Sequence, residues 1–280
     1  MAMTINTNVN SLNAQRNAIN TQSSMATSMQ RLSSGLRVNS AKDDAAGLAI
    51  AERMNTQVRG MNVAIRNAND GISLAQVAEG GLSTVSDMLQ RMRELAVQSI
   101  NSTNTSGDIE ALNQEYTQLS EEVGRTLGAV QFNGQDIFVA TGDFNFQVGA
   151  NAGQTITVGS ASIGISTAAT ITTLTTGANS GLVTANSANS AQLEALDAAI
   201  ATVNETRATL GAVQSRFENT INFLRTSVEN QSAARGRIMD ADFAAETANL
   251  SRAQIMQQAG TAMIAQANQI PQGVLRLLQG

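Results

Sequence analysis

Apolar side chains recur every seven residues between residues 50 and 100, and this repeat limits the possible folds more than any other feature of the sequence. Such spacing is typical of helices that pack along a continuous seam. The repeat consists of Met54, Met61, Ala68, Ala75, Leu82, Leu89 and Ala96, with Val58, Ile65 and Ile72 at four-residue offsets. We therefore expect one long helix with a buried face, weakened or bent near Gly80 and Gly81.

Two other segments carry the same kind of spacing. The shorter one follows a helix-start signal at residues 106–108 and consists of Ile109, Leu112, Tyr116, Leu119 and Val123. The longer one alternates spacings of three and four from Leu193 to Ile238. The first two helices are expected to form an antiparallel hairpin, and all three seams together predict a helical bundle or coiled coil.

The two ends of the chain carry weaker stripes of apolar residues at helical spacing. The N-terminal stripes are Ile5, Val9, Leu12 and Ile19, followed by Met25, Met29, Leu32 and Leu36. The C-terminal stripe is Met256, Gly260, Met263, Ala267, Ile270, Val274 and Leu277. Neither end has an obvious partner of its own. Pro271 lies inside the C-terminal stripe, so a kink or break is expected there.

The middle of the chain differs from both halves, because residues 144–193 contain no charged side chain. Short alternations at residues 144–148 and 155–158, separated by a glycine-bearing stretch, predict a β-hairpin. The pair Asn133-Gly134 predicts another turn just before it. The expected fold is therefore mainly α: a long helical hairpin or coiled-coil bundle formed by both chain ends, with a small β-hairpin region inserted in the middle.

The amino-acid composition argues against most kinds of catalytic chemistry. The chain contains no His and no Cys, so it lacks the usual general base, thiol nucleophiles, disulfides and the commonest metal ligands. Its net charge is −5, and its 17 cationic residues are scattered rather than clustered, which argues against binding nucleic acid. Neither a signal peptide nor an apolar run long enough to cross a membrane is evident. We expect no cofactor, no metal and no membrane insertion.

Adjacent carboxylates at Asp43-Asp44 and Glu121-Glu122, and the pair Asp240 and Asp242, could suggest two-carboxylate catalysis. That chemistry requires carboxyl groups facing each other across a cleft, whereas adjacent residues on a helix point in different directions. We interpret these residues as solvated surface charge and expect no enzyme activity.

Several sequence blocks resemble those of bacterial flagellins. They are INTN at 5–8, LSSGLRVN at 32–39, KDDAAG at 42–47, QRMRELAVQS at 90–99, QFNG at 131–134, LGAVQSRF at 210–217, SRAQI at 251–255 and QANQIPQ at 266–272. The resemblance covers roughly residues 1–142 and 190–280, which leaves only the uncharged middle unmatched. It indicates a short form with almost no outer variable domain.

The resemblance implies a division into inner and rod-like helical parts. Residues 1–44 and 236–280 would form the two halves of an inner helical domain, and residues 45–142 and 191–235 the two parts of a rod-like helical domain. Residues 143–190 would be a short uncharged variable region of β-structure and loop. The implied function is a structural subunit that polymerises into the flagellar filament for swimming motility. The alternative within the same superfamily is a hook-filament junction protein, and a coiled-coil adhesin is a rival of another class.

The end helices are expected to gain order only against neighbouring subunits. Ordering about 35 residues costs ~1–2 kcal/mol each, while about ten stripe residues return ~1.5–3 kcal/mol each only when fully buried. The expected polymerisation residues are Val9, Leu12, Ile19, Met29, Leu32, Leu36, Met256, Met263, Ile270, Val274 and Leu277.

The resemblance also implies partners other than the subunit itself. Arg91, Leu95 and Glu115 match a patch bound by host Toll-like receptor 5, although these residues could equally serve filament packing alone. Val274, Leu275, Leu277 and Leu278 match a C-terminal segment that binds a flagellar export chaperone and is sensed in host cytosol; a frayed terminal helix is the alternative. The family is exported unfolded through a type III apparatus without a cleavable leader. It meets hook-associated and cap proteins outside the cell, so an extracellular flagellar location is implied.

Overall fold

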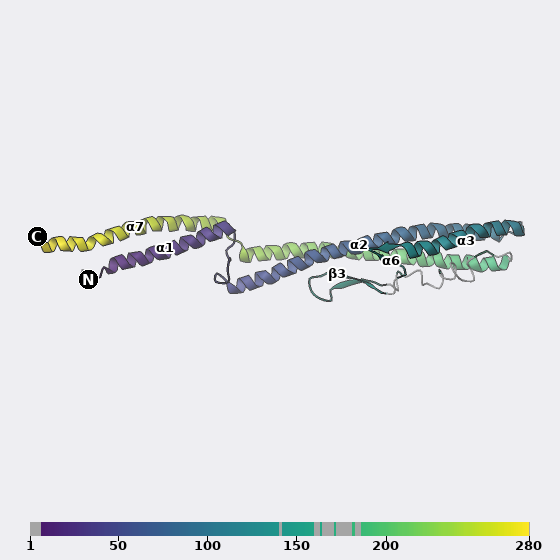
Figure 1. The fold of residues 1–280 in the computed structure, drawn as a ribbon, viewed down its shortest axis with the longest axis horizontal. Helices are drawn as coiled ribbons and strands as arrows, with labels where there is room; N and C mark the ends of the chain where they lie inside the picture. Colours follow the sequence, from purple (N-terminus) through teal and green to yellow (C-terminus); the bar gives the residue numbers. More distant parts are fainter. Residues whose placement is uncertain are drawn as a thin grey trace. The chain divides into compact units, whose positions relative to one another are not determined.

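A computed structural model of the chain describes residues 7–139, 142–159, 163, 171, 181–182 and 186–279, with the backbone alone at 186–188 and 270–279. The helices are α1 (Val9–Ser34), α2 (Ala45–Ser99), α3 (Ser106–Ala129), α6 (Asn186–Met239) and α7 (Phe243–Gln279). The strands are β1 (Gln131–Phe132), β2 (Gln135–Asp136), β3 (Phe144–Gln147) and β4 (Thr155–Val158). The predicted class, mainly helical with small hairpins in the middle, is confirmed (Figure 1).

The chain divides into two compact units. The terminal unit consists of residues 1–56 and 230–280, and the central unit of residues 57–229. The helices α2 and α6 each contribute to both units, because the boundaries fall inside them. The uncharged region predicted at 143–190 belongs to the central unit, and much of it lies outside the described residues.

The central unit is held together by α2, α3 and α6, and α3 runs back along α2 (Figure 1). The heptad repeat of α2 faces the core as predicted, since Ala68, Ala75, Leu82, Leu89 and Ala96 are all fully buried. From α3 and α6 this core receives Tyr116, Val123, Leu127, Leu196, Val203, Leu210 and Phe217. Large apolar side chains at regular spacing therefore stabilise this unit.

The helix α2 continues through Gly80 and Gly81, where a weakened or bent turn was expected. A Cβ atom at Gly81 would lie 2.7 Å from Val130 Cγ2 and 3.4 Å from Phe138. Gly81 therefore allows the segment after α3 to approach α2 closely. Likewise α7 continues through Pro271 without a break.

The predicted start of α3 is confirmed at Ser106. The Thr105 side chain accepts a hydrogen bond from the Asp108 backbone amide, and Asp108 Oδ2 accepts one from the Thr105 amide at 2.9 Å. This reciprocal capping box satisfies two donors at the start of the helix. The Thr105 bonds also hold the pKa of Asp108 below its ordinary value.

Both predicted turns in the middle are confirmed. Asn133 and Gly134 have φ angles of 51° and 75° and join β1 to β2 in a tight hairpin. The strands β3 and β4 pair antiparallel, with Phe146 opposite Ile156.

Two contacts dock the β3–β4 hairpin on the helices. Phe146 meets Phe217 edge to face, with ring centroids 5.5 Å apart. Asn67 Nδ2 donates to the carbonyl oxygen of Gln147 at 2.9 Å. A Cβ atom at Gly71 would lie 2.6 Å from the Phe217 ring, so the glycine makes room for this aromatic contact.

Candidate functional site: the paired end helices

The terminal unit pairs α1 with α7 side by side (Figure 1), so the partner that each end lacks locally is the opposite end of the chain. The buried residues along the pair are small or polar, namely Ser11, Ser28, Ala253, Ala267 and Glu246. Ala14, Ala18, Thr21, Met25, Leu250, Gln257, Gly260 and Ile264 are half-buried between them. The helices therefore meet through a seam of mostly small side chains.

This seam follows heptad spacing, but in a different phase from the stripes of large residues. On α1 it runs through Ser11, Ala18 and Met25, and on α7 through Glu246, Ala253, Gly260 and Ala267. Sequence reasoning placed Met25, Gly260 and Ala267 in its stripes but missed the other four seam residues, because small or polar side chains carry a weak hydrophobic signal. Their seven-residue recurrence was the signal that could have revealed the seam.

Polar contacts fix the two helices in an antiparallel register. Near one end, Asn8 Nδ2 donates to the carbonyl oxygen of Ala267 at 2.7 Å, and Ser11 Oγ donates to Asn268 Oδ1 at 2.8 Å. Near the other end, Arg31 Nη1 lies 3.9 Å from Glu246 Oε2. Residues early in α1 thus meet residues late in α7.

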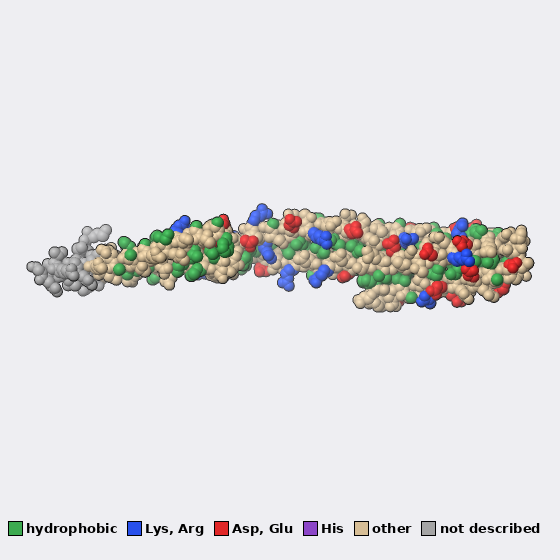
Figure 2. Space-filling view, turned by 90° about the horizontal axis from the view of Figure 1, so that it is seen from above, with side chains coloured by type: hydrophobic (Ala, Val, Ile, Leu, Met, Phe, Trp, Pro, Cys, Tyr) green, Lys and Arg blue, Asp and Glu red, His purple; other side chains and the backbone are tan. Residues whose placement is uncertain are grey.

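The predicted polymerisation residues fall into three groups. Large side chains exposed on the pair are Val9, Leu12, Ile19, Met29, Met256 and Met263, with exposed fractions between 48% and 65%. Leu32 and Leu36 are half-buried. The side chains of Ile270, Val274 and Leu277 lie outside those that the structure describes, as do those of Leu275 and Leu278, which were predicted for the chaperone-binding segment. Figure 2 shows hydrophobic side chains spread along this unit.

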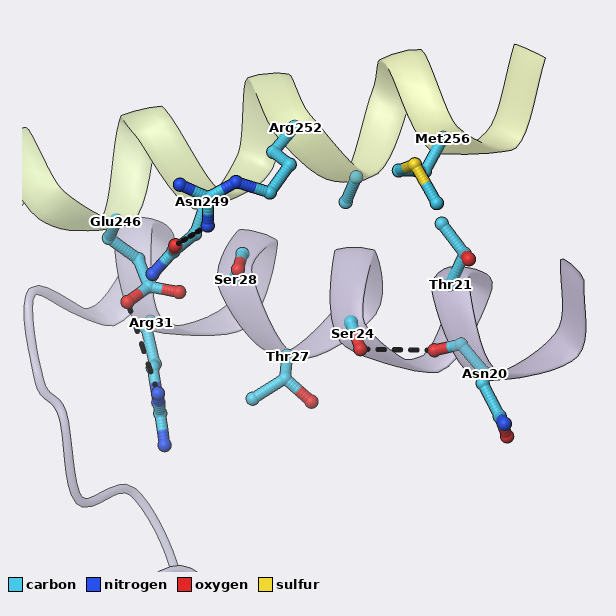
Figure 3. A pocket seen from close by; sticks show the side chains of 11 residues that line it. Asn20, Thr21, Ser24, Thr27, Ser28, Arg31, Glu246, Asn249, Arg252 and Met256 are labelled. Atoms are coloured by element: carbon cyan, nitrogen blue, oxygen red, sulfur yellow. Dashed lines mark hydrogen bonds and ion pairs between the residues drawn. The ribbon is translucent and has the colours of Figure 1, made fainter. Parts of the chain in front are cut away.

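Two hollows lie along the α1–α7 pair. The polar hollow has a volume of about 520 Å³ and is lined by Arg31, Glu246, Asn249, Arg252 and residues of α1 (Figure 3). The apolar groove has a volume of about 420 Å³, and no charged residue lines it. Its rim carries Met256 and Met263.

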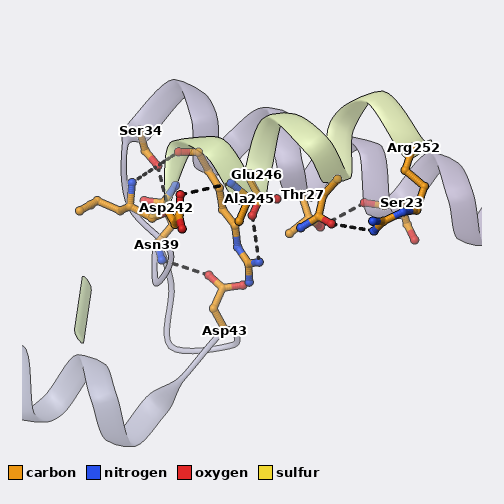
Figure 4. Close-up of polar contacts among 12 residues, drawn as sticks. Ser23, Thr27, Ser34, Asn39, Asp43, Asp242, Ala245, Glu246 and Arg252 are labelled. Atoms are coloured by element: carbon orange, nitrogen blue, oxygen red, sulfur yellow. Dashed lines mark hydrogen bonds and ion pairs between the residues drawn. The ribbon is translucent and has the colours of Figure 1, made fainter. Parts of the chain in front are cut away.

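The breaks between helices meet at one end of the pair (Figure 4). Gly35 ends α1 with a φ angle of 71°, which favours glycine, and its carbonyl oxygen accepts from the Ala241 amide at 2.9 Å. Leu36 pairs with Asp240 in an antiparallel bridge. Arg37 donates from its backbone amide to the carbonyl oxygen of Met239 at 2.6 Å. The α1–α2 and α6–α7 connections therefore hold each other.

The neighbouring carboxylates have local structural partners. Asp43 Oδ2 accepts from the Ser40 hydroxyl and amide, which holds the pKa of Asp43 below its ordinary value. Asp44 Oδ1 accepts from the Gly47 amide at 2.7 Å at the start of α2, and Asp242 Oδ1 accepts from the Ala244 amide at 2.9 Å at the start of α7. Each of these side chains thus holds a turn or a helix start.

The central unit brings together two of the three residues predicted for the receptor patch. Arg91 Nε lies 2.8 Å from Glu115 Oε1, and Arg91 Nη1 lies 2.9 Å from Glu94 Oε2. These carboxylates raise the pKa of Arg91. Leu95, by contrast, is fully buried in the core. Placing Leu95 on this surface was wrong, because its side chain is part of the core that α2 forms with α3 and α6.

Among the described residues, no helix is long and apolar enough to cross a membrane. Within those same described residues, no three His, Cys, Asp or Glu side chains are placed so that they could hold one metal ion. One unit pairs the end helices and exposes apolar side chains, and the other is a well-packed helical core. Together they define a helical protein suited to association with other helices.

Family comparisons identify this class more closely. Residues 5–143 match the bacterial flagellin N-terminal helical region, and residues 193–278 match the bacterial flagellin C-terminal helical region. The flagellin of Halalkalibacterium halodurans is 46% identical over 278 residues, covering 99% of this chain and 100% of that protein. The Bacillus subtilis flagellin is 41% identical, with coverage of 99% and 100%. The crystal structure of Bacillus cereus flagellin gives a TM-score of 0.50 at 31% identity, covering 61% of this chain and 94% of that one.

The chain therefore belongs to the bacterial flagellin family. It is a structural subunit that polymerises into the flagellar filament for swimming motility, and the short form without a large outer domain is confirmed. These matches to flagellins do not favour the hook-filament junction alternative. A filament subunit is part of the extracellular flagellum.

Proposed function

We propose that the exposed apolar faces of α1 and α7 are the polymerisation surface of this subunit, within an inner domain formed by residues 1–44 and 236–280. The observation that supports this most directly is the exposure of large apolar side chains on paired helices that bury small ones. Leu12, Ile19, Met256 and Met263 are each more than half exposed. Burial of such side chains against other subunits would supply ~1.5–3 kcal/mol each.

The substitution Leu12→Asp tests this surface, and Leu12→Ile is its matched control. Leu12 is 57% exposed, so a carboxylate there should leave the helix pair formed in the monomer. In the filament an unpaired buried charge costs several kcal/mol or forces protonation. We expect Leu12→Asp to lose seeded filament growth, followed by light scattering and electron microscopy, while Leu12→Ile retains it. Normal growth of Leu12→Asp would remove this face from the polymerisation surface.

The same assay extends to the end of α7 through Leu277→Asp. Leu277 continues the seven-residue spacing of Met256, Met263 and Ile270. We expect the central unit to remain folded and polymerisation to be lost. Thermal unfolding of the monomer is the accompanying measurement, because a collapsed core would assign Leu277 to the monomer fold instead.

We infer a second role for the surface around Arg91 and Glu115, as the site recognised by Toll-like receptor 5. The supporting observation is an exposed ion pair between two helices, with side chains 49% and 46% exposed. Arginine can make several hydrogen bonds from one planar group, so Arg91→Ala should weaken receptor activation more than Glu115→Ala. Unchanged signalling by a folded double variant would eliminate this role.

We further propose export as an unfolded chain through the type III apparatus, with a chaperone bound at Val274, Leu275, Leu277 and Leu278. Outside the cell, hook-associated and cap proteins would contact the assembled subunits. The absence of Cys from the chain is compatible with this route. Co-purification of the flagellar chaperone with the full chain, compared with a variant carrying serine at the four positions, tests the binding segment. Equal recovery of the chaperone with both would contradict it.

A further inference from the structure

The apolar groove lies on one flank of the α1–α7 seam. Asn10, Asn13 and Asn17 of α1 line one side, and Met256, Ala259 and Met263 of α7 line the other. Its floor is low because the seam residues beneath it are small: a Cβ atom at Gly260 would lie 3.7 Å from that of Ala18. With its uncharged lining and volume of about 420 Å³, the groove suits apolar side chains.

A ridge of large apolar residues lies on α1, on the side of this helix that faces away from the groove. Leu12 and Ile19 follow the groove-lining Asn10 and Asn17 by two residues each, and two residues turn an α-helix by about 200°. Both ridge side chains point into solvent, with exposed fractions of 57% and 65%. The groove and the ridge are therefore separate surfaces of one subunit.

The two surfaces match in spacing as well as in chemistry. Leu12 and Ile19 are seven residues apart on the ridge, and Met256 and Met263 are seven residues apart on the rim of the groove. Helical stripes with the same seven-residue period remain in contact over successive turns. Methionine side chains are flexible and polarisable, so this rim can adapt to branched side chains.

We propose that the Leu12–Ile19 ridge of one subunit seats in the Met256–Met263 groove of a second copy of this chain. The inference rests on the proposed polymerisation surface and assigns the contact within it. Contact between two different surfaces is heterologous, and such contacts can propagate into an open helical polymer. Contact of groove with groove would instead form a closed pair. The filament requires an arrangement that propagates.

A charge exchange between copies tests this contact. Met263→Glu alters the groove, whereas Leu12→Lys and Ile19→Lys alter the ridge at two registers one heptad apart. Met263 is chosen because Arg252 lies one helical turn from Met256 and could pair with a carboxylate placed there. Each variant alone would place a charge against apolar partners at every contact, so none should elongate wild-type seeds.

Mixtures of complementary variants test whether the ridge of one copy contacts the groove of another. In an equimolar mixture of Met263→Glu with one lysine variant, alternating subunits present a lysine ridge to a glutamate groove and an unaltered ridge to an unaltered groove. Every contact is then satisfied, so we expect one of the two mixtures to restore seeded growth to at least one-tenth of the wild-type rate. High salt should weaken this rescued growth more than wild-type growth, because it depends on an ion pair.

Two results would overturn the inference. Normal growth of the single variants would show that neither surface is used, which would also contradict the proposed polymerisation surface. Loss of growth in all single variants and in both mixtures would show that both surfaces take part in assembly without contacting each other, so the polymerisation proposal alone would survive.

Ile19→Leu and Met263→Leu are matched controls that should grow normally. Circular dichroism establishes equal helix content, and the reversed pair Ile19→Glu with Met263→Lys repeats the test.

Discussion

The two units use the same seven-residue spacing for different purposes. In the central unit, the fully buried positions combine alanines with large side chains such as Leu82, Leu89 and Phe217. Along the α1–α7 pair, the buried positions carry small or polar residues such as Ser11 and Ala253, and large side chains such as those of Leu12 and Ile19 are exposed. The two units thus differ in whether their large apolar side chains are buried between the helices or exposed on them.

Unequal cores imply unequal local stability. Burial of apolar area is the dominant favourable contribution to folding, and the α1–α7 seam offers little of it. We expect the terminal unit of the isolated subunit to open at a lower free energy than the central unit. Limited proteolysis of the monomer should therefore remove segments near residues 1–40 and 240–280 and leave a resistant core. Intact ends in the monomer would contradict this difference.

The largest single effect is expected in the central unit, from Phe217→Ala. Phe217 is fully buried, and its ring meets Phe146 and fits against Gly71. Loss of a buried Phe side chain typically costs about 3–5 kcal/mol. Denaturant unfolding should therefore shift strongly to lower concentration.

Phe223 on the same helix provides the matched control, because it is 69% exposed. We expect Phe223→Ala to change the free energy of unfolding by less than about 0.5 kcal/mol. Similar destabilisation by both substitutions would indicate that burial in this core is not what stabilises the central unit.

A smaller effect, confined to the terminal unit, is expected from Gly35→Ala. The left-handed conformation at Gly35 costs roughly 1–2 kcal/mol for a residue with a Cβ atom. Hydrogen exchange should accelerate in α1 and remain unchanged in the central unit. Gly35→Asn, which tolerates this conformation better, is the control, and equal acceleration in both units would show that they unfold together.

The smallest effect is expected from Thr105→Ala, which removes the cap of α3 and costs about 1 kcal/mol. The pKa of Asp108 is lowered from 3.8 in the folded state, so its contribution is fully present above pH 3.8 and is lost as pH falls through the lowered value. The stability difference between Thr105→Ala and wild type should therefore narrow in acid, whereas Thr105→Ser should behave like wild type. A difference independent of pH would exclude the hydrogen bond from the Thr105 hydroxyl to the Asp108 carboxylate as its source.

How far the sequence predicted this structure depends on side-chain size. Leu82, Leu89 and Phe217 are large enough for their spacing to reveal the buried face, and Asn133-Gly134 specifies its turn through backbone conformation. Gly81 lies against Val130 and Phe138, and its local sequence does not reveal this contact with residues far away in the chain. Leu95 was placed on the surface because the motif gives residue identity without the direction in which the side chain points.

The seam of the terminal unit was the hardest part to predict. The sequence periodicity identifies a stripe that contains Leu12 and Ile19, although both side chains are exposed in the structure. The residues that pair the helices, such as Ser11 and Ala253, contribute little hydrophobic signal. Their role depends on the close approach of α1 and α7 and on hydrogen bonds between residues about 260 positions apart. A local sequence pattern contains neither.

Oxidation of the methionines compares the two units directly within one sample. Met256 and Met263 are 55% and 63% exposed, whereas Met61 and Met92 are 6% and 1% exposed. Peroxide oxidation followed by mass spectrometry reports the accessibility of each sulfur atom. In the monomer, we expect rapid oxidation of Met256 and Met263 and slow oxidation of Met61 and Met92. In the filament, Met256 and Met263 should become as protected as the buried pair, whereas equally rapid oxidation in both states would contradict burial of this helix face on assembly.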